Sequence, residues 1–254
     1  MRVVLLTQDE PLFLAPSIEQ LLIEFPSGCE MVACVVFDPS PIARKMGLLG
    51  RAKQLFKVFG TGFFLRYAAM FAAQRLRPSG GLGPVLKKYK VPEVRLANNI
   101  NTHESLDQIR ALKPDLLVSV AGNQIFRLAL IDLAPKGCIN LHTSLLPHYR
   151  GLMPTFWVLR FDEPETAVSV FFVDEGIDTG PLLVQERVPI TTNRLETLIK
   201  QTKRLGMSAV ARAIAKVRDG DVATTPNRAA DGSYFGFPTR DDVRAFKAAG
   251  KRLY

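Results

Sequence analysis

LLVSVAG at residues 116–122 and GCINLH at residues 137–142 are the two stretches that decide the fold. The first is a continuous apolar run, typical of a strand buried on both faces of a parallel sheet. The second is a short strand-like run that ends in polar residues. HESLDQIRALK, at residues 103–113, has helical spacing and follows two capping candidates, Asn101 and Thr102. This order predicts a βαβ unit with a right-handed crossover.

The same alternation continues on both sides of these stretches. Further strands are expected at residues 2–6, 31–37, 91–96, 167–173 and 182–190. Residues 17–24 are expected to form a helix, and a capping-box pattern of Asn193 with Glu196 is expected to open a long helix that ends near Arg218. The fold class predicted is α/β, with a mostly parallel twisted sheet and helices on both faces.

Three regions are expected along the chain. Residues 1–190 are predicted to form one catalytic domain, and residues 191–254 a C-terminal helix and tail. Residues 40–92 are predicted to be a basic helical insert within the first region. No internal repeat and no low-complexity segment interrupts this order.

Composition excludes several classes of protein. The chain has 254 residues, of which 47% are hydrophobic and 22% charged, so it is not a disordered protein. It has no run of about 18 apolar residues that would indicate a membrane span. The apolar start, MRVVLL, is too short for a signal peptide. Three widely spaced cysteines indicate reduced thiols and a cytoplasmic location, and with three histidines they predict no metal site.

The net charge of +9 comes from one block. No Asp or Glu occurs between Ser40 and Pro92, whereas outside this block 22 basic residues face 24 acidic ones. The block's eleven basic residues are Arg44, Lys45, Arg51, Lys53, Lys57, Arg66, Arg75, Arg77, Lys87, Lys88 and Lys90. Residues 44–90 could contact phosphate groups, bind tRNA by charge, or form a solvated insert. They could also lie on a membrane surface, with the apolar side formed by Phe56, Phe59, Phe63, Phe64 and Phe71.

Polar residues gather after the central strands. Asn140 and His142 are two residues apart in a strand, so they project from the same face. They stand at the carboxyl end of a parallel strand, where open α/β sheets bind ligands. The loop Asp174-x-Gly176-x-Asp178-x-Gly180 also follows a strand and can reach that crevice.

An amide, an imidazole and a carboxylate suit acyl transfer without a covalent enzyme intermediate. The Asn140 amide can donate to an oxyanion, and His142 can accept a proton or, as imidazolium, stabilise the same charge. A carboxylate such as Asp178 can fix the histidine tautomer. Ser144 could be proposed as a nucleophile, but the glycine pattern of a nucleophile elbow is absent around it.

INLHTSLLPHYRG followed by VDEGIDTGPLL resembles the formyltransferase family that uses 10-formyltetrahydrofolate, over about residues 113–190. This family includes glycinamide ribonucleotide transformylase, methionyl-tRNA formyltransferase and the sugar N-formyltransferases. The resemblance implies a Rossmann-like fold and a catalytic triad of Asn140, His142 and Asp178. It also implies that these residues stabilise the tetrahedral intermediate and move protons while a substrate amine attacks the formyl carbon.

The resemblance also implies where the folate donor binds. Two loops are expected to hold its pterin, largely through backbone atoms. The residues expected there are Gln124, Ile125, Phe126, Val173, Asp174, Gly176 and Ile177. The loop TQDEPLF after the first strand has no glycine, so the dinucleotide-binding fingerprint is absent.

The acceptor is expected to be a small amine, with a nucleotide-linked amino sugar favoured. The residues expected to bind it are Thr7, Gln8, Ser144, Tyr149, Arg150, Tyr234 and Phe235. Alternatives are a methionyl-tRNA formyltransferase without the C-terminal barrel usual in that group, an enzyme that formylates a lipid-linked amine, and a folate binder without activity. A homodimer through the C-terminal tail is a further expectation from the resemblance.

Overall fold

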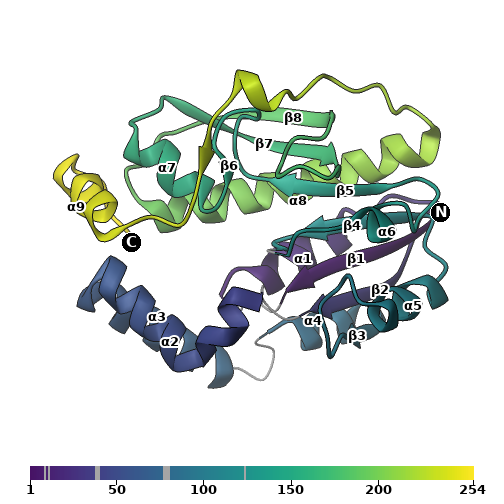
Figure 1. Cartoon of the computed structure of the whole chain (residues 1–254), viewed down its shortest axis with the longest axis horizontal. Helices are drawn as coiled ribbons and strands as arrows, with labels where there is room; N and C mark the ends of the chain where they lie inside the picture. Colours follow the sequence, from purple (N-terminus) through teal and green to yellow (C-terminus); the bar gives the residue numbers. More distant parts are fainter. Residues whose placement is uncertain (9, 11, 38–40, 77–80, 123) are drawn as a thin grey trace.

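A seven-stranded sheet forms the centre of the protein, which we describe from a computed structural model (Figure 1). The structure describes residues 1–8, 10, 12–37, 41–76, 81–122 and 124–254. The strand order is β3-β2-β1-β4-β5-β7-β8. These strands are β1 (Arg2–Gln8), β2 (Glu30–Phe37), β3 (Glu93–Arg95), β4 (Leu116–Val120), β5 (Cys138–His142), β7 (Glu165–Phe172) and β8 (Leu182–Pro189).

The first five strands are parallel to one another, whereas β7 runs antiparallel to both β5 and β8. The strand order reverses between β1 and β4, so the topological switch point lies between the carboxyl ends of these two strands, and β5 is the next strand after β4. A second, two-stranded sheet pairs β6 (Arg150–Gly151) with β9 (Tyr234–Phe235). It joins a loop after β5 to a segment near the C-terminal end of the chain.

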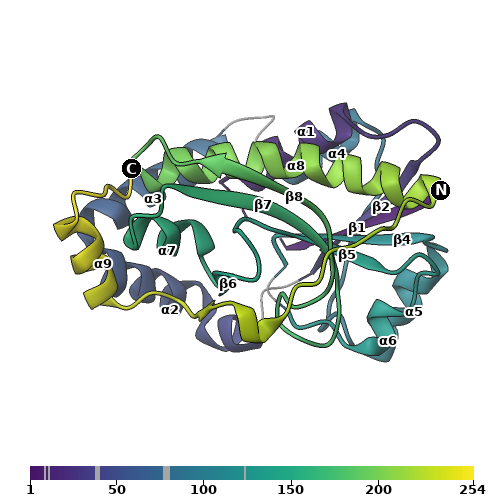
Figure 2. The same ribbon diagram turned by 90° about the horizontal axis from the view of Figure 1, so that it is seen from above.

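Helices cover both faces of the large sheet (Figure 2). The helices are α1 (Leu14–Ile23), α2 (Pro41–Phe59), α3 (Thr61–Leu76), α4 (Leu82–Lys88), α5 (His103–Ala111), α6 (Leu128–Ile131), α7 (Pro154–Arg160), α8 (Leu195–Asp219) and α9 (Arg240–Ala248). Side chains of α1, α4 and α8 pack with one face of the strands, and those of α5 and α6 with the other. The predicted α/β class, with helices on both faces, is confirmed.

Helix α8 belongs to the main core. Its buried residues Val210, Ile214 and Val217 pack in the same cluster as Val3 and Leu5 of β1. The helix therefore shares a hydrophobic core with the strands that precede it. The domain boundary expected at residue 190 stays a prediction.

Within residues 40–92, α2 and α3 form a helical hairpin at the end of the molecule that also carries α9 (Figures 1 and 2), whereas α4 packs in the main core, and the predicted insert stays a prediction. Gly47 interrupts α2 with a φ of 60°. Of the block's basic residues, Arg77 lies outside the described residues, and the structure does not describe the side chains of Arg44, Lys45, Arg51 and Arg75. Over the described residues, no helix is long and apolar enough to cross a membrane.

The predicted capping box of Asn193 and Glu196 is wrong. Helix α8 starts after Arg194 without a side-chain cap, and the Asn193 amide instead donates to the Gly250 carbonyl at 3.1 Å. The Glu196 carboxylate is buried and accepts hydrogen bonds from Arg66 and Lys200. Both residues therefore make contacts with distant parts of the chain and do not cap the helix. An acidic side chain near the start of a helix is favourable in either role.

Two local predictions are confirmed. Thr102 caps α5 by accepting from the Ser105 backbone N–H at 3.3 Å. The three cysteines are free thiols, and burial raises the pKa of Cys34 to about 12, which keeps that thiol protonated.

Candidate active site

Strand β5 carries Asn140 and His142 to the carboxyl end of the parallel strands. Asn140 pairs with Ser119 of β4 on one side and with Phe171 of β7 on the other. His142 is the last residue of the strand and is opposite Ser169. Since residues two apart in a strand share a face, the amide and the imidazole project into the same space.

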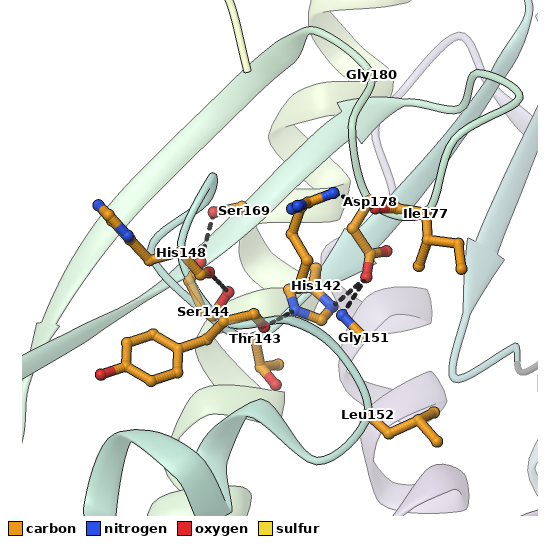
Figure 3. A network of polar contacts seen from close by, with 12 residues as sticks. His142, Thr143, Ser144, His148, Gly151, Leu152, Ser169, Ile177, Asp178 and Gly180 are labelled. Atoms are coloured by element: carbon orange, nitrogen blue, oxygen red, sulfur yellow. Dashed lines mark hydrogen bonds and ion pairs between the residues drawn. The ribbon is translucent and has the colours of Figure 1, made fainter. Parts of the chain in front are cut away.

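The His142 imidazole lies between two acceptor atoms (Figure 3). Its Nε2 is 2.8 Å from the Tyr149 carbonyl oxygen, and its Nδ1 is 3.6 Å from Oδ2 of Asp178. The side chain is only 8% exposed. Because a carbonyl and a carboxylate both accept hydrogen bonds, a doubly protonated ring is the form that can donate to both.

Asp178 is fixed from both its backbone and its side chain. It has a φ of 54°, in the left-handed region, and its Oδ2 accepts the Gly151 N–H at 2.9 Å. The buried Asn227 amide donates to the carbonyl of Asp178 at 3.0 Å and to that of Gly180 at 2.9 Å. These contacts direct the carboxylate toward the imidazole.

Glycine is required at position 151. Its φ is 96°, and a Cβ added there would lie 2.3 Å from the Phe235 carbonyl oxygen. The close approach results from the pairing of β6 with β9, in which the Leu152 N–H donates to Phe235 at 2.9 Å. The glycine thus lets the chain pass close enough to β9 for its own N–H to reach Asp178.

Asn140 differs from His142 and Asp178 because its side-chain amide makes no hydrogen bond to any residue that the structure describes. The residue is half-buried. A half-buried side-chain amide that is held at the carboxyl end of a strand can donate to an oxygen of a bound molecule.

Two of the residues expected to bind the acceptor serve the fold instead. The Ser144 hydroxyl is fully buried and donates to the His148 carbonyl at 2.8 Å, and the Thr7 hydroxyl is fully buried and donates to the Val120 carbonyl at 2.8 Å. Neither is open to a ligand in this arrangement. Gln8 follows at the end of β1, and its Oε1 is buried without a partner among the described residues.

Tyr149 and Phe235 belong to an aromatic cluster. Their rings stack at 5.4 Å, and Phe235 also stacks on Trp157 at 4.8 Å. Burial raises the pKa of Tyr149, as does the hydrogen bond that its hydroxyl donates to Glu163. Tyr149 therefore reaches His142 through its carbonyl, while its ring faces away into the cluster. Tyr234 is 53% exposed and remains open to a ligand.

Arg150 joins the Asp178 loop to the segment at Ala229. Its guanidinium donates to the carbonyls of Ile177 and Ala229 at 3.4 and 3.3 Å, and its Nε is buried without a partner among the described residues. Both bonds are long, so the guanidinium can exchange them for a stronger acceptor such as a phosphate.

The two loops expected to hold the pterin both present apolar side chains. Ile125 is 64% exposed and Ile177 is 41% exposed, and Figure 3 shows Ile177 on the same side of the imidazole as Leu152. Phe126 is buried against Phe37, and the Gln124 carbonyl oxygen of the side chain accepts the Ile100 N–H. Asp174 accepts bonds from Gly176 and Thr179 within its own loop. The role of these loops stays a prediction.

Among the described residues, no three His, Cys, Asp or Glu side chains form a group that could hold a metal ion. The site that does exist is an amide, an imidazole and a carboxylate. Sequence reasoning named all three, but it missed Asn227 and the segment around it. No local pattern marks a residue whose partners lie 47 and 49 positions away.

Comparisons with known proteins show the family to which the chain is similar. The family model described as formyl transferase matches residues 1–214. A methionyl-tRNA formyltransferase of Kosmotoga olearia is 33% identical over 160 residues, covering 63% of this chain and 51% of the relative. That of Trichlorobacter lovleyi is 36% identical over 155 residues, covering 58% and 49%. The chain spans about half the length of these curated relatives.

Solved structures share the fold at low sequence identity. A sugar N-formyltransferase from a Shewanella species matches with a TM-score of 0.61 at 16% identity, covering all of this chain and 89% of its own. Glycinamide ribonucleotide transformylase 1 from Symbiobacterium toebii matches with a TM-score of 0.62 at 16% identity, covering 90% and 92%. Since the family model covers most of the sequence, the chain belongs to the formyl transferase family.

Proposed function

We propose that the protein transfers a formyl group from 10-formyltetrahydrofolate to the primary amine of a small acceptor, most specifically an amino sugar carried by a nucleotide. The observation that carries this proposal is the arrangement of Asn140, His142 and Asp178 at the carboxyl end of β5, with the imidazole 3.6 Å from the carboxylate. A folate supplies a formyl group bound to nitrogen, and the residues described below act on it.

The fit of a folate is supported by the loops after β4 and β7. Ile125 and Ile177 each leave part of an apolar side chain exposed, 64% and 41% respectively, and a flat pterin ring would cover such surfaces. An N-formyltransferase from Helicobacter canadensis, which shares the fold with a TM-score of 0.61 at 15% identity, was solved with folinic acid and dTDP-3-aminofucose. That complex is a property of the neighbour, and it favours the same pairing of ligands here.

Asn140 acts first in the proposed mechanism. As the amine nitrogen bonds to the formyl carbon, electrons of the C=O bond move onto the formyl oxygen. The Asn140 amide, which has no partner among the described residues, donates to that oxygen. A fixed donor at a developing oxyanion lowers the barrier by about 3 kcal/mol.

His142 and Asp178 act on charge and protons. The imidazole faces two acceptors and, when doubly protonated, places a positive charge near the oxyanion. The 3.6 Å between Nδ1 and Oδ2 is long for a direct hydrogen bond, so a proton passes between them with a slight movement or through a water molecule. The amine loses its proton along this route, and the folate nitrogen gains one as its bond to carbon breaks.

A nucleotide-linked acceptor is supported by the rim of the crevice. Arg150 offers a guanidinium whose Nε lacks a partner among the described residues, and Tyr234 offers a half-exposed ring for stacking. Phosphate and a flat base or sugar are the groups that such side chains bind. Neither residue is needed for the chemistry, so both belong to acceptor recognition in this proposal.

A second candidate is transfer to methionyl-tRNA. Relatives with that activity are 33% and 36% identical to this chain, which is closer than the 16% identity of the sugar N-formyltransferase. The eleven basic residues between Ser40 and Pro92 also fit a polyanion. The two candidates differ in acceptor and share the formyl donor and the three central residues.

Tetrahydrofolate release from 10-formyltetrahydrofolate tests both candidates. The purified protein is given nucleotide-linked amino sugars, methionyl-tRNA or glycinamide ribonucleotide, with His142→Ala as the inactive control. Turnover with an amino sugar that is lost in the variant supports the first candidate. Turnover only with methionyl-tRNA overturns it in favour of the second, and folate binding without turnover on any acceptor contradicts both.

A further inference from the structure

Helix α3 is apolar on two opposite faces. On its inner face, Phe63 stacks on Phe59 of α2 at 4.6 Å and on Tyr67 at 4.1 Å. These rings pack in a cluster with Phe156 of α7 and Phe246 of α9. The inner face thus docks the hairpin of α2 and α3 onto the rest of the protein.

The opposite face, here called the outer face of α3, is exposed. At 100° per residue its members fall within one sector of the helix. It consists of Leu65, Ala68, Ala69, Ala72 and Leu76. Leu65 is 60% exposed and Leu76 is 84% exposed. A solvent-facing helix side normally carries polar residues, so an unbroken apolar face indicates a partner that covers it.

The charge of α2 and α3 indicates the chemistry of the partner. From Pro41 to Leu76, the span of these two helices, the sequence has seven basic residues and no acidic residue, and one of the seven, Arg66, is paired with Glu196. On the neighbouring helix, Lys53 and Lys57 are exposed, as is Phe56 at 48%. A second copy of the chain would bring an equal positive charge against this one, which opposes self-association here. A lipid surface with an apolar interior and anionic headgroups would complement both the exposed leucines of α3 and the lysines of α2.

The hairpin is also fixed in place. Arg66 of α3 donates from Nε and Nη2 to Oε2 of the buried Glu196 at 2.9 and 2.8 Å, and its guanidinium lies 5.1 Å from the ring centre of Tyr254. Lys200 bonds the other oxygen of Glu196 at 2.7 Å. These contacts hold α3 with its inner face on the protein and its outer face directed away from it.

We infer that the outer face of α3 lies on an anionic lipid surface, with Lys53 and Lys57 of α2 contacting the headgroups. Apolar side chains of the outer face enter the boundary between headgroups and acyl chains, while lysines remain at the headgroup level. Because no helix of the described residues is long enough to span a membrane, this contact is peripheral. The inference is independent of which amine the enzyme formylates.

Co-sedimentation of the full-length protein with vesicles tests the inference. One set of vesicles contains phosphatidylglycerol and phosphatidylcholine, and the other contains phosphatidylcholine alone. We expect the protein to sediment with the anionic vesicles only. Leu65→Gln with Leu76→Gln should lower the partition coefficient about a hundredfold, since each leucine contributes about tenfold through burial. Lys53→Gln with Lys57→Gln should lower it about fivefold per lysine.

Matched variants separate binding from folding. Ile23→Gln with Leu205→Gln removes exposed apolar side chains from α1 and α8 and should leave sedimentation unchanged. Ala69→Gln with Ala72→Gln changes the outer face without altering a leucine and should reduce sedimentation as well. Circular dichroism melting identifies any variant that fails to fold.

Three outcomes would overturn the inference. The first is sedimentation of Leu65→Gln with Leu76→Gln at the level of the unaltered protein. The second is a dimer, detected by light scattering, that this double variant dissociates, because the occupant would then be a second copy. The third is that the protein binds RNA in a way that depends on Lys53 and Lys57 but does not sediment with anionic vesicles. None of these readouts requires formyl transfer, so they remain decisive if the proposed acceptor is wrong.

Discussion

The site around His142 and the outer face of α3 differ in the kind of group that lacks a partner. In the part of the chain that the structure describes, the site leaves a polar donor free, whereas the outer face of α3 leaves apolar side chains exposed. In the crevice the imidazole and the carboxylate have protein partners, and the Asn140 amide has none among the described residues. On α3 the polar Arg66 is paired with Glu196, and the leucines have no cover. In each region the unpaired groups match the ligand proposed: a hydrogen-bond donor for an oxyanion, and apolar side chains for lipid.

Changing His142 should give the largest effect and should affect only the crevice. His142→Ala is expected to lower kcat by about a thousandfold, because general acid–base catalysis and a nearby charge are lost together. Stopped-flow or steady-state tetrahydrofolate release measures this loss. His148→Ala is the control, since Figure 3 shows that ring directed away from Asp178. An equal loss in both variants would contradict the assignment.

Asn140→Ala comes next in expected size. Removal of an oxyanion donor should lower kcat about a hundredfold to a thousandfold, with the folate Kd changed little. Single-turnover kinetics with a titration of folate fluorescence separates the two quantities. If folate affinity falls as far as kcat does, Asn140 binds the ground state and the proposed role is wrong.

Asn227→Ala should give a smaller loss in the same region. The amide holds the carbonyls of Asp178 and Gly180, so its removal should loosen the carboxylate and lower kcat about tenfold. The folate Kd should stay within about twofold. Asn193→Ala is a matched control, because that amide also donates to a carbonyl, at Gly250, away from the crevice. Equal kcat for both variants would remove Asn227 from a positioning role.

Glu196 provides a pH test of the region that holds α3. Burial raises the pKa of this carboxyl, but hydrogen bonds and charge from Lys200 and Arg66 outweigh it, so its pKa lies below the ordinary 4.5. Its contribution to stability is complete above that value and is lost as the pH falls through the lower, folded-state pKa. Glu196→Gln should lower the free energy of unfolding at pH 7 by about 1–2 kcal/mol.

Urea unfolding at a series of pH values measures this dependence. The unaltered protein should lose stability between about pH 5 and pH 3, and Glu196→Gln should lose less over that interval. Glu24→Gln, on an exposed side chain of the α1 cap, is the control for general acid effects. Parallel curves for the unaltered protein and Glu196→Gln would contradict the assigned direction.

Lys53→Gln with Lys57→Gln should give the smallest effect. In solution these exposed residues lie outside the crevice, so kcat with a soluble acceptor should change by less than about twofold and the free energy of unfolding by about 0.5 kcal/mol or less. The same variant is expected to weaken vesicle binding. A large loss of kcat with a small acceptor would show that α2 influences the site around His142, and would contradict the view that the two regions act independently.

The strands could be predicted well from the sequence because a buried strand appears as a short run of consecutive apolar residues. LLVSV at residues 116–120 is apolar throughout, and every one of its residues is buried in β4. The direction of β7 could not be predicted, because an apolar run such as AVSVFF has the same pattern in a parallel and an antiparallel strand. Pairing partners depend on the whole sheet rather than on the strand.

The candidate site also has one part that could be predicted from local sequence and one part that could not. Asn140 and His142 are two residues apart in one strand, so their common direction follows from the strand period. Asn227 and the pairing of β6 with β9 join residues that are far apart in sequence, and no local signal marks them. Glu196 was misread because its position suits a cap, while its partner Arg66 lies 130 residues earlier.

The contacts that residues 225–237 make with the Asp178 loop and with β6 have a consequence for folding during synthesis. Thr225 pairs with Leu182, Asn227 holds the Asp178 loop, and β9 pairs with β6. Synthesis releases the chain from its N-terminal end, so the parallel strands can collapse while this segment is still inside the ribosome. The site therefore acquires its final geometry only after residues 225–237 have left the ribosome, and a chain that stops before Thr225 would carry Asn140, His142 and Asp178 without the contacts that hold the Asp178 loop in place.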